Sequence, residues 1–118
     1  MKTVLVTGAS GFIGRHIVKI LDKNGIRVKA GIHTPAQKNI FYGLKNVEPV
    51  QLDILNLDSI NNAMQNVDSL FHFAALVSSH QSREKLTNIN ALGTRNVWKI
   101  AVENNVTSAL YCSTTAVY

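Results

Sequence analysis

The sequence predicts an α/β fold, a doubly wound parallel sheet with strand order 3-2-1-4-5. Short apolar runs rich in β-branched residues alternate with longer segments in which apolar residues recur every three or four positions. A glycine-rich turn joins the first apolar run to the first longer segment. This alternation is typical of parallel strands joined by right-handed helical crossovers, because helices then cover both faces of the sheet.

The first strand is expected over residues 2–7 (KTVLVT), a short β-branched run closed by Gly8. A helix follows, and Gly25 supplies the left-handed residue that commonly ends one. Its apolar face consists of Ile13, Ile17, Ile20 and Leu21. Residues 27–32 (RVKAGI) form the second expected strand, and Pro35 breaks the chain soon afterwards.

The third strand is expected within residues 46–52 (NVEPVQL), where Pro49 indicates a sheet edge or a segment outside the paired region. Asn56 and Asp58 are both candidates for the N-cap of the next helix. The apolar face of that helix consists of Ile60, Ala63, Met64 and Val67. Residues 68–76 (DSLFHFAAL) then form a fourth strand, which is apolar nearly throughout.

A long helix and a fifth strand, residues 107–113 (TSALYCS), complete the predicted sheet. The face of the long helix is marked by Ile89, Gly93, Val97, Ile100 and Ala101. Glycine in that face, at Gly93, indicates close packing. Ligands on such sheets bind at the carboxyl ends of the strands, near the switch point between the first and fourth strands. Functional residues are therefore expected directly after strands.

The composition indicates one globular domain, residues 1–118, with 46% hydrophobic and 16% charged residues. The net charge of +5 is compatible with nucleic-acid binding, but the basic residues are scattered, and an anionic small molecule explains the charge equally well. No apolar run reaches the roughly 20 residues that cross a bilayer. We therefore expect neither a nucleic-acid nor a membrane partner. The lack of a signal peptide and the single Cys112 favour a cytoplasmic protein.

Residues 7–14 (TGASGFIG), between the first strand and the first helix, predict a phosphate-binding turn. Gly8 allows a sharp turn out of the strand. Gly11 lets a pyrophosphate approach backbone amides at the positive end of the helix, and Gly14 lets the helix pack closely on the sheet. No Lys followed by Ser or Thr comes after the last glycine, so this is not a P-loop for nucleoside triphosphates. The alternative is a tight turn that binds no ligand.

With these residues the chain resembles the extended short-chain dehydrogenases/reductases, the NAD-dependent epimerase/dehydratase group. Five motifs occur in the family's order: TGASGFIG (7–14), LDIL (52–55), FHFAAL (71–76), NALGT (90–94) and STTAVY (113–118). The resemblance implies a Rossmann fold that binds a nicotinamide dinucleotide, with Asp53 and Ile54 near the adenine. The cofactor-binding residues that it implies are Gly8, Ser10, Gly11, Phe12, Ile13, Gly14, His33, Asp53, Ile54, Phe73, Ala74, Ala75 and Asn90.

The resemblance leaves the choice between NADP and NAD open, with a slight preference for NADP. An NAD-preferring site usually has an acid at the end of the second strand, which binds the ribose 2′-hydroxyl, but Ile32 occupies that position here. Family members with arginine at the position of His33 often accept a 2′-phosphate. His33, Lys38 and Arg15 are the candidates for binding that anion. Otherwise His33 is a solvated loop residue.

Other reactive side chains have structural explanations. His72 lies inside the fourth expected strand. It is either a base near the nicotinamide or a hydrogen-bonded core histidine, and the second interpretation is favoured. No cluster of His, Cys, Asp and Glu has the spacing of a metal site, so no metal is predicted. Trp98 is expected to pack on the long helix, or to join a subunit interface if the protein is a homo-oligomer.

By resemblance, Thr114 takes the position of the catalytic Ser or Thr whose hydroxyl orients the substrate oxygen. The alternative is a strand-end threonine that bonds to the backbone. Tyr118 matches the closing aromatic residue of this motif, not the catalytic tyrosine. The family's Tyr-x-x-x-Lys pair, which moves the proton, occurs nowhere in the 118 residues.

These features predict the N-terminal, cofactor-binding part of a longer enzyme, truncated before the last strands and the substrate domain. The parent would be an NAD(P)-dependent epimerase, dehydratase or oxidoreductase acting on a nucleotide sugar or a similar small carbonyl or alcohol substrate. The chain alone is expected to bind dinucleotide weakly, to lack turnover and to associate through uncovered surface. The alternative is a non-catalytic NAD(P)-sensing or regulatory protein on the same fold.

Overall fold

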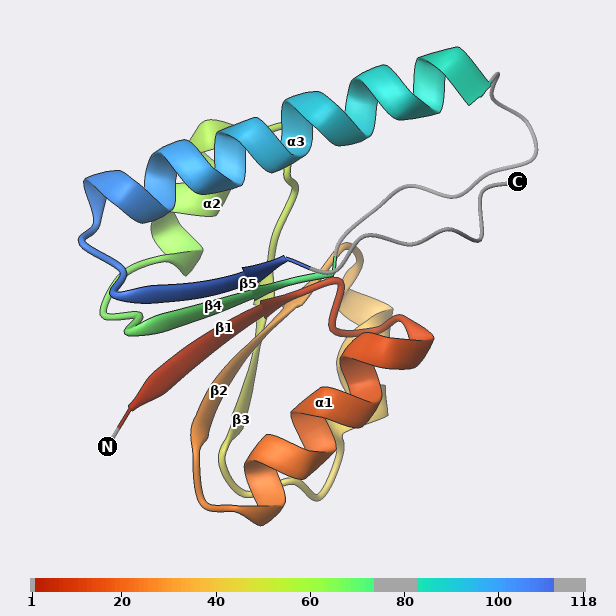
Figure 1. Ribbon diagram of the computed structural model, residues 1–118. Helices are drawn as coiled ribbons and strands as arrows, with labels where there is room; N and C mark the ends of the chain where they lie inside the picture. The colour runs from red at the N-terminus through yellow and green to blue at the C-terminus, as the bar shows by residue number, and fades with distance from the viewer. Residues whose placement is uncertain (1, 74–82, 112–118) are drawn as a thin grey trace.

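The computed structural model describes residues 2–73 and 83–111. In this part of the chain, parallel strands form one five-stranded sheet in the predicted order, β3-β2-β1-β4-β5 (Figure 1). The strands are β1 (Thr3–Thr7), β2 (Arg27–Ile32), β3 (Val47–Gln51), β4 (Ser69–His72) and β5 (Ser108–Tyr111). The helices are α1 (Phe12–Lys23), the 3-10 helix η1 (Pro35–Phe41), α2 (Leu57–Ala63) and α3 (Arg83–Glu103). The fold is therefore the predicted doubly wound, Rossmann-like one.

The helices cover the two faces of the sheet, with α1 and η1 on one side and α2 and α3 on the other (Figure 1). Val4 and Val6 of β1 belong to the core under α1, whereas Leu5 belongs to the core under α2 and α3. This arrangement explains why β1 is apolar at successive positions. The predicted apolar faces of α2 and α3 are buried at Ile60, Ala63, Met64, Val67, Gly93, Val97, Ile100 and Ala101.

Helix α1 forms where the apolar spacing predicts, but only part of the predicted apolar face is buried. Leu21 packs against the core under α1, and Ile17 is half-buried. Val18 and Gly14 are buried, whereas Ile13 and Ile20 are 50% and 56% exposed. The prediction centred the face on the large side chains. The helix instead approaches the sheet most closely at the glycine, where no side chain keeps the two apart. The helix ends as expected, and Gly25 has a left-handed φ of 74°.

The segment between β2 and β3 differs from the expected break at Pro35, because the 3-10 helix η1 begins at that residue. Proline suits the first position of a helix, since its φ is already helical and it has no N–H that needs an acceptor. Gln37 stabilises this start, its Oε1 accepting from the backbone N–H groups of His33 at 2.8 Å and Thr34 at 3.1 Å. These bonds hold the backbone at His33, directly after β2.

Three further local predictions are confirmed. Strand β3, which contains Pro49, is at the edge of the sheet. Of the two N-cap candidates, Asn56 caps α2, because its Oδ1 accepts from the Ser59 N–H at 3.0 Å. A Cβ placed on Gly93 would lie 2.3 Å from Cδ1 of Ile54, so α3 packs closely there.

Candidate functional site

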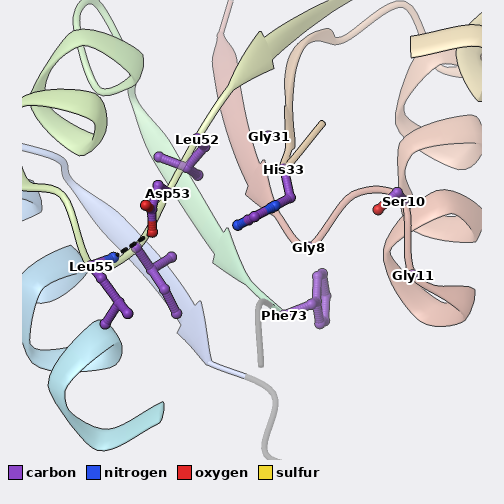
Figure 2. A pocket seen from close by; sticks show the side chains of 10 residues that line it. Gly8, Ser10, Gly11, Gly31, His33, Leu52, Asp53, Leu55 and Phe73 are labelled. Atoms are coloured by element: carbon purple, nitrogen blue, oxygen red, sulfur yellow. Dashed lines mark hydrogen bonds between the residues drawn. The ribbon is translucent and has the colours of Figure 1, made fainter. Parts of the chain in front are cut away.

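A pocket opens where β1 to β4 end, at the edge of the sheet where the topology predicts a ligand (Figure 2). Its volume is about 320 Å³, within the range of small-molecule sites. The residues that line it are Gly8, Ser10, Gly11, Gly31, His33, Leu52, Asp53, Ile54, Leu55 and Phe73. The sequence predicts all of these except Gly31, Leu52 and Leu55, so the fold gathers site residues from four separate segments.

The first wall is the turn between β1 and α1. Gly8 has a φ of 66°, a left-handed value that glycine adopts without steric cost. Its carbonyl accepts from the Gly11 N–H at 3.1 Å. A Cβ on Gly14 would lie 2.1 Å from that same carbonyl oxygen, so the helix can start this close to the turn only with glycine. Helix α1 has neither a side-chain cap nor an acid in its first turn, which leaves its positive end available to an anion.

The second wall is the end of β2. A Cβ on Gly31 would lie 2.7 Å from Cδ2 of Leu52, so the glycine allows β2 and the residue after β3 to approach closely. The exposed His33 ring points into the pocket (Figure 2). Ile32, at the position where an acid would select NAD, is buried in the core under α1. Gly31 and Leu52 were missed because they lie at strand ends without a polar group to mark them.

The third wall is the loop at residues 53–55, after β3. The Asp53 carboxylate accepts from the Leu55 N–H at 2.9 Å (Figure 2). The Asp53 N–H donates to Ser59 Oγ of α2 at 2.9 Å. Ile54 is buried, and its carbonyl accepts from Asn96 Nδ2 of α3 at 3.0 Å. The loop is thus tied to two helices, while the side chains of Asp53 and Leu55 remain exposed.

The fourth wall is Phe73, directly after β4. Its ring points into the pocket near Gly8 (Figure 2). The ring also packs edge-on against Phe71, with ring centroids 6.4 Å apart. Its backbone N–H donates to the Thr7 carbonyl at 3.2 Å and to Thr7 Oγ1 at 3.0 Å. Phe73 is therefore positioned at the point where β1 and β4 separate.

The buried histidine of β4 is a core residue, as the sequence favours. His72 is fully buried, with Nδ1 at 2.6 Å from Thr7 Oγ1 and Nε2 at 3.0 Å from Thr94 Oγ1. Desolvation by burial lowers the pKa of His72 to about 4, so the ring is neutral at pH 7. It does not line the pocket.

Several predicted residues lie elsewhere. Phe12 and Ile13 are exposed on α1, Gly14 is buried beneath the turn, and Asn90 is on α3, and none of these four lines the pocket. Ala74, Ala75 and Thr114 lie outside the described residues.

The other candidates for an anion site are also outside the pocket. Lys38 is exposed on η1 and does not line the pocket. Arg15 does not line it either, and its buried Nε has no hydrogen-bond partner within residues 2–73 and 83–111. Of the three basic candidates for a 2′-phosphate, only His33 is placed at the pocket.

Two absences hold for the described part of the chain. It contains no group of three or more His, Cys, Asp or Glu side chains that could hold a metal ion. Among the same residues, no helix has both the length and the apolar character needed to span a membrane.

Residues 4–118 match the NAD dependent epimerase/dehydratase family. The chain belongs to this family. It is 34% identical over 112 residues to sterol demethylase protein B of Methylococcus capsulatus. The matched residues cover 94% of this chain and 34% of that protein.

Two solved structures of similar fold contain bound NAD. A short-chain dehydrogenase/reductase superfamily protein from Agrobacterium tumefaciens with bound NAD has a TM-score of 0.80 and 25% identity, covering 95% of this chain and 32% of that one. MoeE5 in complex with UDP-glucose and NAD has a TM-score of 0.78 and 28% identity, and the match covers 98% of this chain and 38% of that one. The epimerase/dehydratase chain therefore spans about a third of the length of these relatives.

Proposed function

We propose that this chain is the dinucleotide-binding part of an NAD(P)-dependent epimerase, dehydratase or reductase. The observation that carries the proposal is that one pocket joins the turn at Gly8 and Gly11 to the loop at Asp53, across the switch point of the sheet. A dinucleotide needs both walls, one for its pyrophosphate and one for its adenosine. The proposed substrate is a nucleotide sugar or a similar carbonyl or alcohol compound, and the UDP-glucose bound to MoeE5 favours the first class.

The pyrophosphate would bind at the turn between β1 and α1. Gly11 is exposed there, and it has no side chain between its backbone and the ligand. A Cβ at this position would lie 3.3 Å from the Gly8 carbonyl oxygen. The pyrophosphate can therefore approach the backbone of the turn closely. Backbone amides of the first helical turn have no intrahelical acceptor, and no side chain caps them. These amides and the positive helix end would stabilise the two negative charges of the pyrophosphate.

The adenosine would bind against the 53–55 loop. Leu52 and Leu55 provide apolar surface for the base. The Asp53 carboxylate uses Oδ1 to accept from the Leu55 N–H, and its second oxygen can accept from the amino group of adenine. Because Ser59 and Asn96 hold this loop from the two helices, the recognition surface is formed before the ligand binds.

NADP is the proposed cofactor, by a slight preference over NAD. His33 points into the pocket next to the end of β2. Among the residues that the structure describes, the acid that lines the pocket is Asp53, on the loop after β3 and not at the end of β2. We expect His33→Ala to weaken NADP binding by roughly 3- to 10-fold, the value of one hydrogen bond, and to leave NAD binding unchanged. Calorimetry measures the dissociation constants of the wild-type chain and of the His33→Ala variant, each with NADP and with NAD. Tighter binding of NAD than of NADP by the wild-type chain would contradict the preference.

The bound nicotinamide would supply hydride acceptance or donation at the substrate carbon, and the protein would have to move a proton with it. Thr114 is the proposed hydroxyl that orients the substrate oxygen. Since the 118 residues contain no Tyr-x-x-x-Lys, we propose that this chain does not turn over substrate.

Direct binding tests the proposed function. The chain is titrated with NADPH and NADH, and with ADP as a probe of the adenosine half. We expect both dinucleotides to bind, with ADP weaker, and no oxidation of NADPH in the presence of UDP-sugars. A folded chain that binds neither dinucleotide at millimolar concentration would refute the assignment, and turnover would refute the proposed inactivity.

The second candidate is a non-catalytic dinucleotide sensor or regulator. Thr114 favours the enzyme over this candidate, because a sensor needs no hydroxyl for a substrate. A Tyr-x-x-x-Lys encoded after Tyr118 would decide for the enzyme, and a longer coding sequence without that pair would decide for the sensor.

A further inference from the structure

Gly31 is a buried glycine inside a strand, where glycine is usually unfavourable. It lies near the end of β2 and pairs with Val50 of β3. Its φ lies outside the left-handed range, so the backbone conformation itself does not require glycine. Glycine weakens a strand, because its flexible backbone loses more freedom on folding than that of any other residue. The reason for glycine at this position must therefore lie in what surrounds its Cα.

Gly31 faces the side of the sheet that α2 and α3 cover. Its neighbours Ala30 and Ile32 belong to the core under α1, and successive side chains of a strand point to opposite faces. Lys29, two residues before Gly31, accordingly reaches α2, where its Nζ donates to the Ala63 carbonyl at 3.4 Å. A side chain at position 31 would point to this same side.

A side chain at position 31 would displace Leu52, which lines the pocket beside Gly31 (Figure 2). A Cβ on Gly31 would lie 2.7 Å from Leu52 Cδ2 and 3.1 Å from the carbonyl oxygen of Val6. The oxygen is part of the backbone of β1 and cannot move aside, so the leucine has to move. Leu52 is only 5% exposed and packs in the core under α2 and α3, so the open space that it borders is the pocket. A methyl group on residue 31 would therefore push the leucine into the pocket.

The backbone of Gly31 has a separate task, which a side chain would leave intact. Its carbonyl accepts from the Ala9 N–H at 3.2 Å, in the turn between β1 and α1. One residue later, the Ile32 carbonyl accepts from the Leu52 N–H at 2.8 Å. The end of β2 thus lies between the turn and the 53–55 loop. Because the bond to Ala9 involves only main-chain atoms, a substitution at position 31 should narrow the loop side of the pocket and spare the turn.

We propose that Gly31 is a specificity-determining residue of this pocket. By lacking a side chain it keeps Leu52 out of the space between the two walls, which leaves room for a nucleoside attached to the pyrophosphate. With a methyl group at this position, the turn would still bind pyrophosphate, but the pocket would exclude the nucleoside. The inference rests on the proposed function, because it assigns the turn to pyrophosphate and the 53–55 loop to adenosine.

Gly31→Ala tests this role when it is titrated with ADP, NADPH and inorganic pyrophosphate. We expect affinity for ADP and NADPH to fall by roughly 10-fold or more, the effect of one misplaced methyl group in a pocket, and affinity for pyrophosphate to stay the same. Gly25→Ala is the matched control. It also adds a methyl group to a glycine next to β2, but at the opposite end of the strand, where a φ of 74° makes its cost conformational. Its affinity for ADP should equal that of the wild type.

A second substitution tests whether Leu52 is the group that moves. Leu52→Val removes Cδ2, the atom that the new methyl group would meet. In the Gly31→Ala background it should recover most of the lost affinity for ADP, whereas alone it should change that affinity little. Such non-additivity is expected only for residues in contact. A double variant that binds ADP as weakly as Gly31→Ala does would refute the displacement of Leu52.

The outcomes separate this role from the proposed function. A wild-type chain that binds neither ADP nor NADPH refutes the proposed function and, with it, the role of Gly31. A wild-type chain that binds ADP, together with a Gly31→Ala variant that binds it equally well, refutes the role of Gly31 alone. Loss of pyrophosphate binding in Gly31→Ala, or equal weakening of ADP binding by Gly25→Ala, would show a general loss of structure and would also refute it.

Discussion

The glycines of the first turn tolerate a side chain to very different degrees. Gly8 needs its left-handed φ of 66°, and Gly14 has backbone atoms where a Cβ would be. Gly11 has a φ of −72° and more room, since a Cβ there would lie 3.3 Å from the nearest atom. The three glycines are regularly spaced in the sequence, but the steric reason for glycine differs at each position.

Gly14→Ala should therefore be the most damaging alanine substitution in this turn. Its Cβ would meet the Gly8 carbonyl at 2.1 Å, and backbone atoms cannot rotate away as a side chain can. We expect a loss of about 3 kcal/mol or more in the free energy of unfolding, the upper end for overpacking. Urea denaturation measures it, with Gly11→Ala as control at a cost within about 1 kcal/mol. Equal stability of the two variants would contradict the geometry.

His72 also predicts how stability changes with pH. Burial lowers its pKa from the unfolded value of 6.5 to about 4 in the folded protein. Above pH 6.5 both states are neutral, and between 6.5 and 4 only the unfolded chain takes up the proton. Stability should therefore fall as the pH drops through that window, by about 3 kcal/mol in total.

Urea denaturation at several pH values measures this loss, and the His72 ring titration, followed by NMR, measures the folded pKa directly. A His72 ring that titrates near pH 6.5 in the folded protein would contradict the prediction.

At the scale of elements, the pocket depends on how α2 and α3 hold the loop after β3. Ser59 is in the first turn of α2, where its N–H donates to the Asn56 cap while its hydroxyl accepts from the Asp53 N–H. The helix start and the pocket wall are thus joined through one side chain. Gly93 lets α3 approach Ile54 on the other side.

Ser59→Ala should loosen this wall without unfolding the helix. The Asp53 amide is exposed, so water can replace the lost acceptor, and the loss in stability should be about 0.5–1 kcal/mol. Affinity for ADP should fall more than affinity for inorganic pyrophosphate, because the loop is on the side proposed for the adenosine. Binding titrations of both probes measure the difference, and Ser59→Thr, which keeps the hydroxyl, should bind as the wild type does.

At the scale of the whole molecule, the described chain exposes apolar groups that a covered sheet would bury. All four residues of β5 are exposed, including Leu110, which pairs with Phe71 in register. Edge strand β3 contains Glu48 and Pro49, which discourage pairing with another chain, whereas β5 (SALY) has neither charge nor proline. The two edges therefore differ in their tendency to associate.

We expect the chain to associate at high concentration through the surface around β5. Leu110→Lys adds a charge to this edge and should lower the apparent mass in sedimentation velocity at the highest concentration. Leu57→Lys is a matched control, because Leu57 is similarly exposed at the start of α2. A wild-type chain that stays monomeric throughout, or equal effects of the two variants, would refute this surface as the cause.

Much of the fold and the main wall residues follow from local pattern. The β-branched runs, the helical spacing and the glycine turn predict the strand order, because right-handed crossovers leave few ways to bury both faces of a parallel sheet. Gly8 was found just after a strand, since the carboxyl ends of parallel strands meet at one edge, whereas His33, Asp53 and Phe73 were implied by the family resemblance.

Other features depend on distances between segments far apart in the chain, which no local pattern contains. The buried face of α1 was predicted only in part, because the closest approach to the sheet is at Gly14, whose lack of a side chain gives no apolar signal. Leu52 and Leu55 look like ordinary core residues until β2 and β3 bring them to the pocket. The partners of His72 lie 65 and 22 residues away, so its hydrogen bonds exist only after β1 and α3 have packed around it.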